Sequence, residues 1–398
     1  MTTRRKAHPA RSRRTASAQT NTSSITLSPA PGSRMPAEWA PHESTWLAWP
    51  HFRGDWPGKF DPIPWVYAEI VRHLTRHERV DLIVSSADAE KRARKTLKLA
   101  NALNNNVAFH RWPTNRVWTR DSGCSFVSDA GAPAGENASS PTNHAGRVPA
   151  EQSSASWQAI KWRFTAWAKY PNYRHDEKIG SLMAKAAQAE EIRAHHRDTQ
   201  VVLEGGSIDV NGEGALLTTE ECLLSKVQQR NPGFRREDYE QIFATYLGIR
   251  KVIWLGQGIT GDDTHGHVDD ITRFVTPDTI VTVIESNSKD KNYVPLQENL
   301  RRLKSATDQD GNPFHIVELP MPAPVIFEGR RLPASYGNFY IGNGAVLVPV
   351  FNDPKDRIAL NILADLFPDR QIVPIYSGDL IWGFGALHCM TQQQPAIG

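Results

Sequence analysis

The stretch EGGSIDVNGEGALLTT, Glu204 to Thr219, decides the fold class of this sequence. Its Asn-Gly pair at 211–212 predicts a tight turn between two short strands. The residues that follow predict a helix over 236–247 and then a strand, KVIWL, at 251–255. The stretch therefore opens a unit of two strands, a helix and a third strand.

The same unit recurs along the chain and predicts an α/β fold. Related segments occupy residues 45–86, 120–164, 266–320 and 335–376. The run LIWGFGALHCMTQ at 380–392 would supply the strand missing from the first unit. About five units of roughly 60–70 residues indicate radial or stacked repetition of one supersecondary element.

Each unit carries an unusual polar residue at a matching place, which we assign to its first strand. These residues are Asp121, Glu204, His267 with Asp269, Asn338 and Cys389. If the units surround an axis, the matching positions converge at the centre. Burying a charge is costly without a partner, so packing alone explains this pattern poorly.

Cys389 is either an ordinary buried thiol or a nucleophile. The adjacent His388 does not decide between the two, because neighbours in a strand face opposite sides of the sheet. An activating base would have to come from elsewhere in the chain.

The run GDDTHGHVDD is the densest polar segment, and strand alternation would place His267 and Asp269 on one face. It predicts an acid/base histidine beside a substrate-binding carboxylate. A metal site including His265 and a solvated loop remain as alternatives. For Asp121 the alternative is a surface ion pair with Arg120, and for Glu204 it is a tight turn at the two following glycines.

One thiol, one histidine and three carboxylates suit a cationic substrate. A planar guanidinium matches such a site, because carboxylates can bind it bidentately. The sequence contains no serine elbow, phosphate-binding loop or dinucleotide fingerprint. We therefore expect no metal and no cofactor.

The charge distribution separates a basic N-terminus from a mildly acidic remainder. The net charge is +3, but residues 1–34 contain seven of the 46 basic residues and no acidic one, which leaves 39 basic against 43 acidic residues. A nucleic-acid-binding protein is therefore not indicated. We expect a disordered basic tail at 1–34, with an acid-free targeting peptide as the alternative and Met35 as a candidate biological start.

We expect residues 35–398 to form one catalytic domain with a low-complexity surface insertion at about 128–156. The three scattered cysteines fit a reducing compartment, and no apolar run is long enough to span a membrane. A cytoplasmic location is therefore expected.

Seven segments, in order along the chain, resemble the agmatine deiminase family, the bacterial-type peptidylarginine deiminase group of the guanidine-modifying superfamily. The resemblance extends from Met35 to Pro395 apart from the insertion. The segments are MPAEWAPHESTWLAWPH (35–51), VWTRDSG (117–123), WRFTAWAKYP (162–171), LEGGSIDVNGEGALLTTEECLLS with RNP (203–232), DDTHGHVDDITRFV (262–275), SYGNFYIGNGAVLVP (335–349) and HCMTQQQP (388–395).

The resemblance implies a five-bladed pseudo-symmetric α/β propeller of ββαβ units, in agreement with the repeat count. It also implies hydrolytic deimination of agmatine to N-carbamoylputrescine and ammonia through a covalent Cys thiouronium. By motif position, Cys389 is the nucleophile and His267 the acid/base. Asp121 and Asp269 hold the guanidinium, and Glu204 supports the substrate and the histidine. Asn338 lines the site, and Trp118 lies near the alkyl chain of the substrate.

Two positions depart from the pattern of the family. Cys124 follows Gly123 where the family often has proline, which predicts a second thiol near Asp121. Ala386 replaces an asparagine before the nucleophile, and so puts the choice of substrate in question. Apart from Arg273, the sequence shows no spare arginine that obviously faces the site, which favours a substrate ending in an amine.

The expected partner is a small cationic guanidine, and family members are commonly homo-oligomers, here expected to be a dimer. Deimination of peptidylarginine or free arginine with the same Cys/His/Asp chemistry is the main alternative. Amidino transfer to a second amine and a non-catalytic binding scaffold are two further alternatives.

Overall fold

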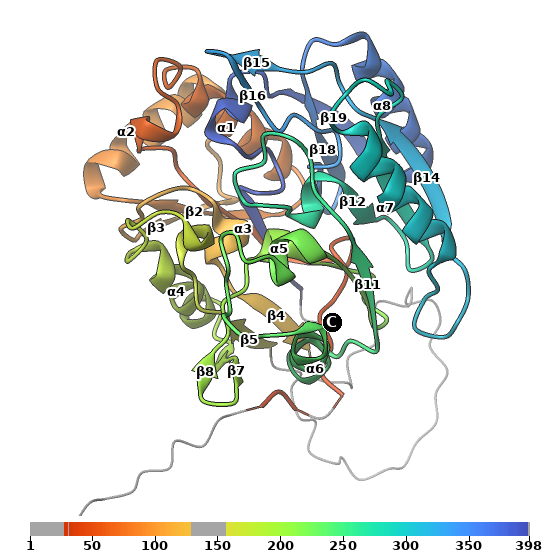
Figure 1. Ribbon diagram of the computed structural model, residues 1–398. Coiled ribbons are helices and arrows are strands. Elements are labelled where there is room, and N and C mark those ends of the chain that lie inside the picture. The colour runs from red at the N-terminus through yellow and green to blue at the C-terminus, as the bar shows by residue number, and fades with distance from the viewer. Residues whose placement is uncertain (1–27, 31, 129–156, 397–398) are drawn as a thin grey trace, which may run out of the picture.

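The computed structural model describes residues 28–30, 32–128 and 157–396. These residues form a mixed α/β fold (Figure 1). Most of the predicted tail and nearly all of the predicted insertion lie outside the described residues. The backbone of Arg34, near the start of the described residues, pairs with that of Ser128, the last described residue before Trp157.

Five sheets follow the same pattern: the first strand is antiparallel to the second, and each later strand is parallel to its neighbour. One of them has four strands and the others have three. In spatial order they are β20–β1–β2–β3 (Thr391–Pro395, His42–Ala48, Arg79–Val84, Val107–Arg111), β4–β5–β6 (Ser125–Ser128, Trp157–Lys161, Glu190–Arg193), β9–β10–β11 (Asp209–Val210, Ala215–Thr219, Lys251–Leu255), β12–β13–β14 (Thr272–Phe274, Thr279–Ile284, His315–Pro320) and β17–β18–β19 (Tyr340–Ile341, Ala345–Val350, Gln371–Tyr376). Two further pairs are β7–β8 (His195–His196, Thr199–Gln200) and β15–β16 (Ile326–Phe327, Arg330–Arg331).

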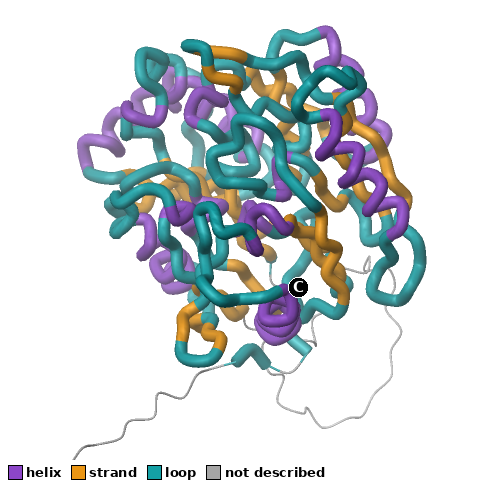
Figure 2. The backbone as a smooth tube through the Cα atoms, viewed as in Figure 1, coloured by secondary structure: helices purple, strands orange, loops and turns teal. Residues whose placement is uncertain are grey.

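In each three-stranded sheet a longer helix connects the second strand to the last, and in the four-stranded sheet such a helix precedes each of the last two strands. These helices lie toward the outside of the molecule, with most of the strands between them (Figure 2). Each is too short or too polar to span a bilayer, as is every other helix in the described ranges. The α-helices are α1 (Ile63–Leu74), α2 (Ala87–Leu99), α3 (Thr119–Ser122), α4 (Ile179–Ala186), α5 (Glu220–Leu224), α6 (Arg236–Leu247), α7 (Tyr293–Ser305) and α8 (Pro354–Leu366). The 3-10 helices are Arg53–Asp55, Ala166–Ala168, Asp176–Lys178, Gly205–Ser207, Val268–Asp270 and Leu380–Gly383.

The predicted unit around Glu204–Thr219 is confirmed in its order and in most of its bounds. Helix α6 and strand β11 have the predicted limits. The helix begins where the side chain of Asp238 accepts a hydrogen bond from the backbone N–H of Arg235, and it ends at Gly248, whose φ is 69°. Local capping therefore sets both ends of the helix.

The prediction that the last run supplies a strand to the first unit is also confirmed. Strand β20 lies antiparallel to β1, and the indole N–H of Trp46 donates to Oε1 of Gln394 at 3.1 Å. Gln393 Oε1 accepts from the Arg120 guanidinium at 2.7 Å. These buried partners explain why glutamines occupy a strand that is otherwise enclosed.

The assignment of the polar residues to first strands is wrong. Asp121 lies on the short helix α3, and Cys389 lies in a turn that precedes β20. Glu204 and His267 each stand at the N-cap of a 3-10 helix, and Asn338 precedes β17. All five therefore stand just before the first strand of a sheet. A tight turn suits them because it lets neighbouring side chains point the same way and exposes backbone N–H groups that can bind carboxylates.

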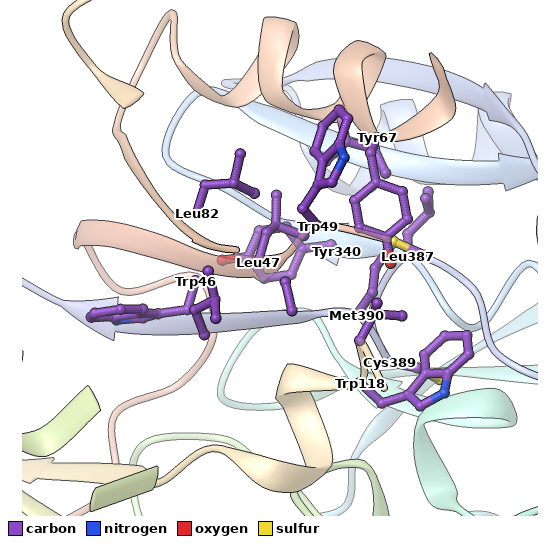
Figure 3. Close-up of a cluster of buried hydrophobic side chains, with 14 of the residues drawn as sticks. Trp46, Leu47, Trp49, Tyr67, Leu82, Trp118, Tyr340, Leu387, Cys389 and Met390 are labelled. Carbon is purple, nitrogen blue, oxygen red and sulfur yellow. The ribbon is translucent and has the colours of Figure 1, made fainter. Parts of the chain in front are cut away.

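Three hydrophobic clusters form the core, and the largest extends to the candidate nucleophile. Figure 3 shows Trp118 and Cys389 at the edge of this cluster, beside Met390. An added Cβ on Gly385 would lie 2.7 Å from the ring of Trp118 and 3.1 Å from the Cβ of Cys389. The packing of the core therefore fixes one side of the thiol.

Candidate active site

A cavity of about 190 Å³ opens above Cys389. Its walls are rich in aromatic rings, and its inner end contains carboxylates and the thiol. The lining residues are Gly54, Asp55, Pro57, Arg116, Trp118, Asp121, Trp167, Tyr170, Asp263, Thr264, Arg330, Trp382, Gly383, Phe384, Gly385 and Cys389.

The Cys389 thiol is held between an amide and a carboxylate. Nδ2 of Asn338 donates to its Sγ at 3.1 Å, and the Sγ lies 3.7 Å from Oδ2 of Asp269. Burial, with the negative charges of Asp269, Asp270 and Asp121, raises the pKa of Cys389 well above its usual range. In the absence of a cation, the sulfur is therefore protonated at neutral pH.

Asp121 presents its carboxylate to the cavity from α3. The N–H of Gly206 donates to Oδ1 at 3.0 Å, and the indole N–H of Trp167 donates to Oδ2 at 2.8 Å. Burial raises the pKa of Asp121 to about 6, against the opposing effect of His267. Near neutral pH the group is mostly ionised and can bind a cation.

Asp269 also lies near the thiol and is fully buried. Its Oδ2 contacts Nδ1 of His388 at 2.7 Å, whereas Oδ1 has no hydrogen-bond partner among the described residues. Burial favours the neutral acid, but His388, His267 and Arg273 together outweigh burial and lower the pKa of Asp269. Asp269 therefore has one oxygen, Oδ2, near Cys389 and bound to His388, and a second oxygen, Oδ1, without a partner among the described residues.

Asp270, the next residue, is paired differently. Its Oδ1 accepts a hydrogen bond from Asn338 at 3.0 Å. Burial and the neighbouring charge of Asp269 raise the pKa of Asp270 well above its usual value. Two adjacent carboxyl groups are thus driven to opposite protonation states by their surroundings.

His267 is fully buried beside Asp121 and Glu204. Its Nδ1 lies 3.8 Å from Oδ1 of Asp121, and its Nε2 lies 3.6 Å from Oε2 of Glu204. Burial alone would lower its pKa, but Asp121, followed by Cys222 and Glu204, raises it well above the ordinary value. His267 is therefore a cationic acid at neutral pH.

Glu204 is anchored by Arg230, which sequence reasoning did not identify. The Arg230 Nε lies 3.2 Å from both carboxylate oxygens, and neither side chain is exposed. Burial raises the pKa of Glu204, but Arg230 and His267 together outweigh burial and lower that pKa overall. Glu204 is thus a fixed anion against which His267 rests.

Of the predicted site residues, Asp121, Trp118 and Cys389 line the cavity, whereas Glu204, His267, Asp269 and Asn338 are buried next to them and do not line it. Trp118 lines the cavity next to Cys389. Oδ1 of Asn338 also accepts from the N–H of His388 at 3.0 Å, which fixes the turn that carries the thiol. Cys124, the predicted second thiol, is buried and does not line the cavity. Burial raises its pKa to about 12. Ala386 is also buried outside the lining.

Sequence reasoning missed four residues at the site. These are Arg230, Asp270, Trp167 and His388. All four stand inside the family-like segments, which was the one available signal. Strand alternation predicts that His388 points away from Cys389. In the structure both residues lie in a turn, and both contact Asp269.

Two groups of side chains have the spacing of a metal site. They are Glu204, Cys222 and His267, and, nearer the cavity, Asp269, Asp270 and Cys389. Arg230 already binds Glu204, and His388 already binds Asp269. Each group thus has a cationic or hydrogen-bonding partner from the protein that competes with a metal ion.

Comparison with known proteins agrees with this chemistry. The family described as Porphyromonas-type peptidyl-arginine deiminase matches residues 34–395. The chain is 33% identical over 390 residues to an agmatine deiminase of Pseudomonas aeruginosa (strain LESB58), covering 92% of this chain and 96% of the relative. It is 33% identical to the agmatine deiminase of Ectopseudomonas mendocina (strain ymp), covering 94% and 98%.

A solved structure agrees as well. The agmatine deiminase of Enterococcus faecalis, described as catalysing its reaction, superposes with a TM-score of 0.78 at 28% identity, over 92% of this chain and 96% of that one. With the family match over nearly the whole described length, this similarity extends to the fold. The chain therefore belongs to the agmatine deiminase family, the Porphyromonas-type peptidyl-arginine deiminases, whose members are enzymes acting on guanidine groups.

Proposed function

We propose that the protein hydrolyses agmatine to N-carbamoylputrescine and ammonia through a covalent intermediate on Cys389. One observation carries the proposal: Cys389, Asp121 and an aromatic wall that includes Trp118 line a single cavity, with Asp269 3.7 Å from the thiol. The relatives named agmatine deiminases support the choice of substrate.

The first step is binding of the guanidinium between Asp121 and Asp269. Two carboxylates facing a planar cation fix its central carbon against the sulfur. The same cation offsets the negative charges that raise the pKa of Cys389. Substrate binding therefore favours the thiolate, and the enzyme forms its nucleophile mainly when substrate is present.

In the second step the thiolate forms a C–S bond to the guanidinium carbon, and the π electrons move to nitrogen. His267, protonated at the start, gives its proton to the departing nitrogen, the C–N bond breaks and ammonia leaves. Neutral His267 then takes a proton from water, and the oxygen adds to the thiouronium carbon. The adduct then collapses: its oxygen becomes the carbonyl of the ureido product, the hydroxyl proton passes to the sulfur, and the C–S bond breaks to restore the thiol.

Free arginine or peptidylarginine is a second candidate substrate, favoured by arginines at the cavity. Arg273, the residue suspected from the sequence, is buried against Glu38 and Asp209 and does not line the cavity. Arg116 and Arg330 do line it. Arg116 pairs with Asp55, whereas Arg330 has no ion-pair partner among the described residues. The Arg330 guanidinium stacks over the ring of Phe384, 4.5 Å from its centroid, and its unpaired charge suits a substrate tail that ends in a carboxylate.

The test is ammonia release from agmatine, free arginine and an arginine peptide in parallel, with a chelator present and Cys389→Ala as the blank. Release from agmatine, abolished in the folded Cys389→Ala variant, supports the proposal. Turnover of arginine alone would keep the mechanism and change the substrate. Turnover near wild type in Cys389→Ala would remove Cys389 as the nucleophile, and loss of activity on chelation would require a metal.

The five equivalent sheets support a five-bladed propeller of ββαβ units in which the site occupies the centre. An experimental structure would test this arrangement by showing whether the five sheets follow one another around a single axis. A homodimer stays a prediction that light scattering of the purified protein would check.

A further inference from the structure

We propose that His388 positions Asp269, the carboxylate that holds the substrate guanidinium, through the contact of its Nδ1, while the buried anion Glu38 lies against the other side of the ring. The inference rests on the proposed function, in which Asp269 grips the amidine part of the substrate. His388 is a positioning residue in this role, because it acts through Asp269.

The contacts of His388 are short on both sides of the ring. Nδ1 of His388 lies 2.7 Å from Oδ2 of Asp269, and Nε2 lies 2.7 Å from Oε2 of Glu38. All three side chains are at least nine-tenths buried. Both ring nitrogens of His388 therefore lie within hydrogen-bond distance of a carboxylate oxygen, one on each side of the ring.

Glu38 is itself firmly anchored. Its Oε1 accepts from the N–H of Ile341 at 2.8 Å and lies 2.9 Å from Arg273, and its Oε2 lies 3.1 Å from Arg120. Arg273 continues to Asp209. A series of close polar contacts therefore runs from Arg273 through Glu38 and His388 to Asp269, and a bound guanidinium would extend it.

Asp269 depends on His388 more than Glu38 does. Within the described part of the chain, His388 is the only nitrogen donor to the Asp269 side chain, whereas Glu38 keeps three other donors without it. Oδ2 of Asp269 also lies 3.7 Å from the Cys389 sulfur. The backbone that follows His388 carries that sulfur, so one turn places both the thiol and its neighbouring carboxylate.

Two substitutions separate the two contacts. In His388→Asn, the side-chain N–H₂ takes the place of Nδ1 and can still donate to Asp269. In His388→Gln, the N–H₂ takes the place of Nε2 and can donate only to Glu38. Both variants replace the ring with an uncharged amide, so they form a matched pair that differs in which carboxylate keeps a donor.

The readout is alkylation of the Cys389 thiolate, which displaces a halide, by cationic 2-chloroacetamidine and by neutral iodoacetamide. The ratio of the two rate constants reports the carboxylate clamp without requiring turnover or a known substrate. We expect His388→Gln to lower the ratio by about 10- to 100-fold, since a hydrogen bond to a buried charge is lost. His388→Asn should stay within about threefold of wild type.

A ratio in His388→Gln equal to that of wild type would overturn the inference, as would equal losses in both variants. A merely structural role would lower the melting temperature and the iodoacetamide rate without changing the ratio. A wild-type protein that shows no preference for the cationic reagent would refute the proposed clamp, and with it this role. Absence of agmatine turnover with the expected ratios would refute only the proposed substrate.

Discussion

Gly206 allows the sharpest test of the carboxylate clamp. Its φ lies outside the left-handed region, so alanine is compatible with the backbone there. An added Cβ, however, would lie 2.6 Å from Nδ1 of His267 and 2.9 Å from both Oδ1 of Asp121 and Oδ2 of Asp269. One methyl group thus collides with three site atoms at once.

The magnitude follows from these distances. Contacts between a Cβ and its neighbours ordinarily lie at 3.4–4 Å, so the shortfalls from 3.4 Å are 0.8, 0.5 and 0.5 Å. Overpacking of this kind costs about 1–3 kcal/mol of unfolding free energy. A displacement of about 1 Å in a positioned group can cost about 100-fold in rate, so we expect kcat/KM for agmatine to fall by about 10- to 100-fold.

The assay compares Gly206→Ala with Gly256→Ala, in which the nearest neighbour of the added Cβ lies at 3.4 Å. Ammonia release gives kcat/KM, and urea unfolding gives the free energy of unfolding. The control should retain activity within about twofold, since its new methyl group meets only ordinary contacts. Wild-type kcat/KM in a folded Gly206→Ala protein would refute the placement of the clamp around this residue.

Two further outcomes follow from buried partners in the site. Arg230→Met leaves the Glu204 carboxylate buried without its arginine partner, and we expect the free energy of unfolding, measured in urea, to fall by about 3–5 kcal/mol. A fall of less than about 1 kcal/mol would contradict the pairing. Trp167→Phe removes the N–H that stabilises ionised Asp121, whose pKa of about 6 should then rise. Because the clamp needs the ionised form, which prevails above the pKa, kcat/KM should fall more at pH 6 than at pH 8, and a profile with an unchanged midpoint would contradict this.

Periodicity and turn chemistry were enough to predict the repeating unit. Helix α6 shows why: an Asp at its third position and a Gly just past its end are local signals, and they mark its limits in sequence and structure alike. Four of the polar residues also occupy matching positions in the structure, because each stands just before the first strand of a sheet. They are Asp121, Glu204, His267 and Cys389.

The conformation of those positions could not be predicted. A 3-10 turn such as Val268–Asp270 is too short to show a period, and the neighbouring strand pattern made His267 and Asp269 resemble strand residues. The same error hid His388. Arg230 was missed for a different reason, since its partner Glu204 is 26 residues away and nothing in a loop sequence indicates a pairing across that distance.

The pairing of β20 with β1 has a consequence for how the site comes into being. It joins Trp46 to Gln394, positions 348 residues apart, and contacts of such separation are slow to form. Cys389 sits in the turn directly before that strand, whereas its carboxylate neighbours come from the middle of the chain. A partly folded chain therefore holds its sulfur away from the acids that control it. Assembly of the reactive centre is delayed until the two ends of the fold meet, so reactivity of this thiol toward amidines would report completion of folding.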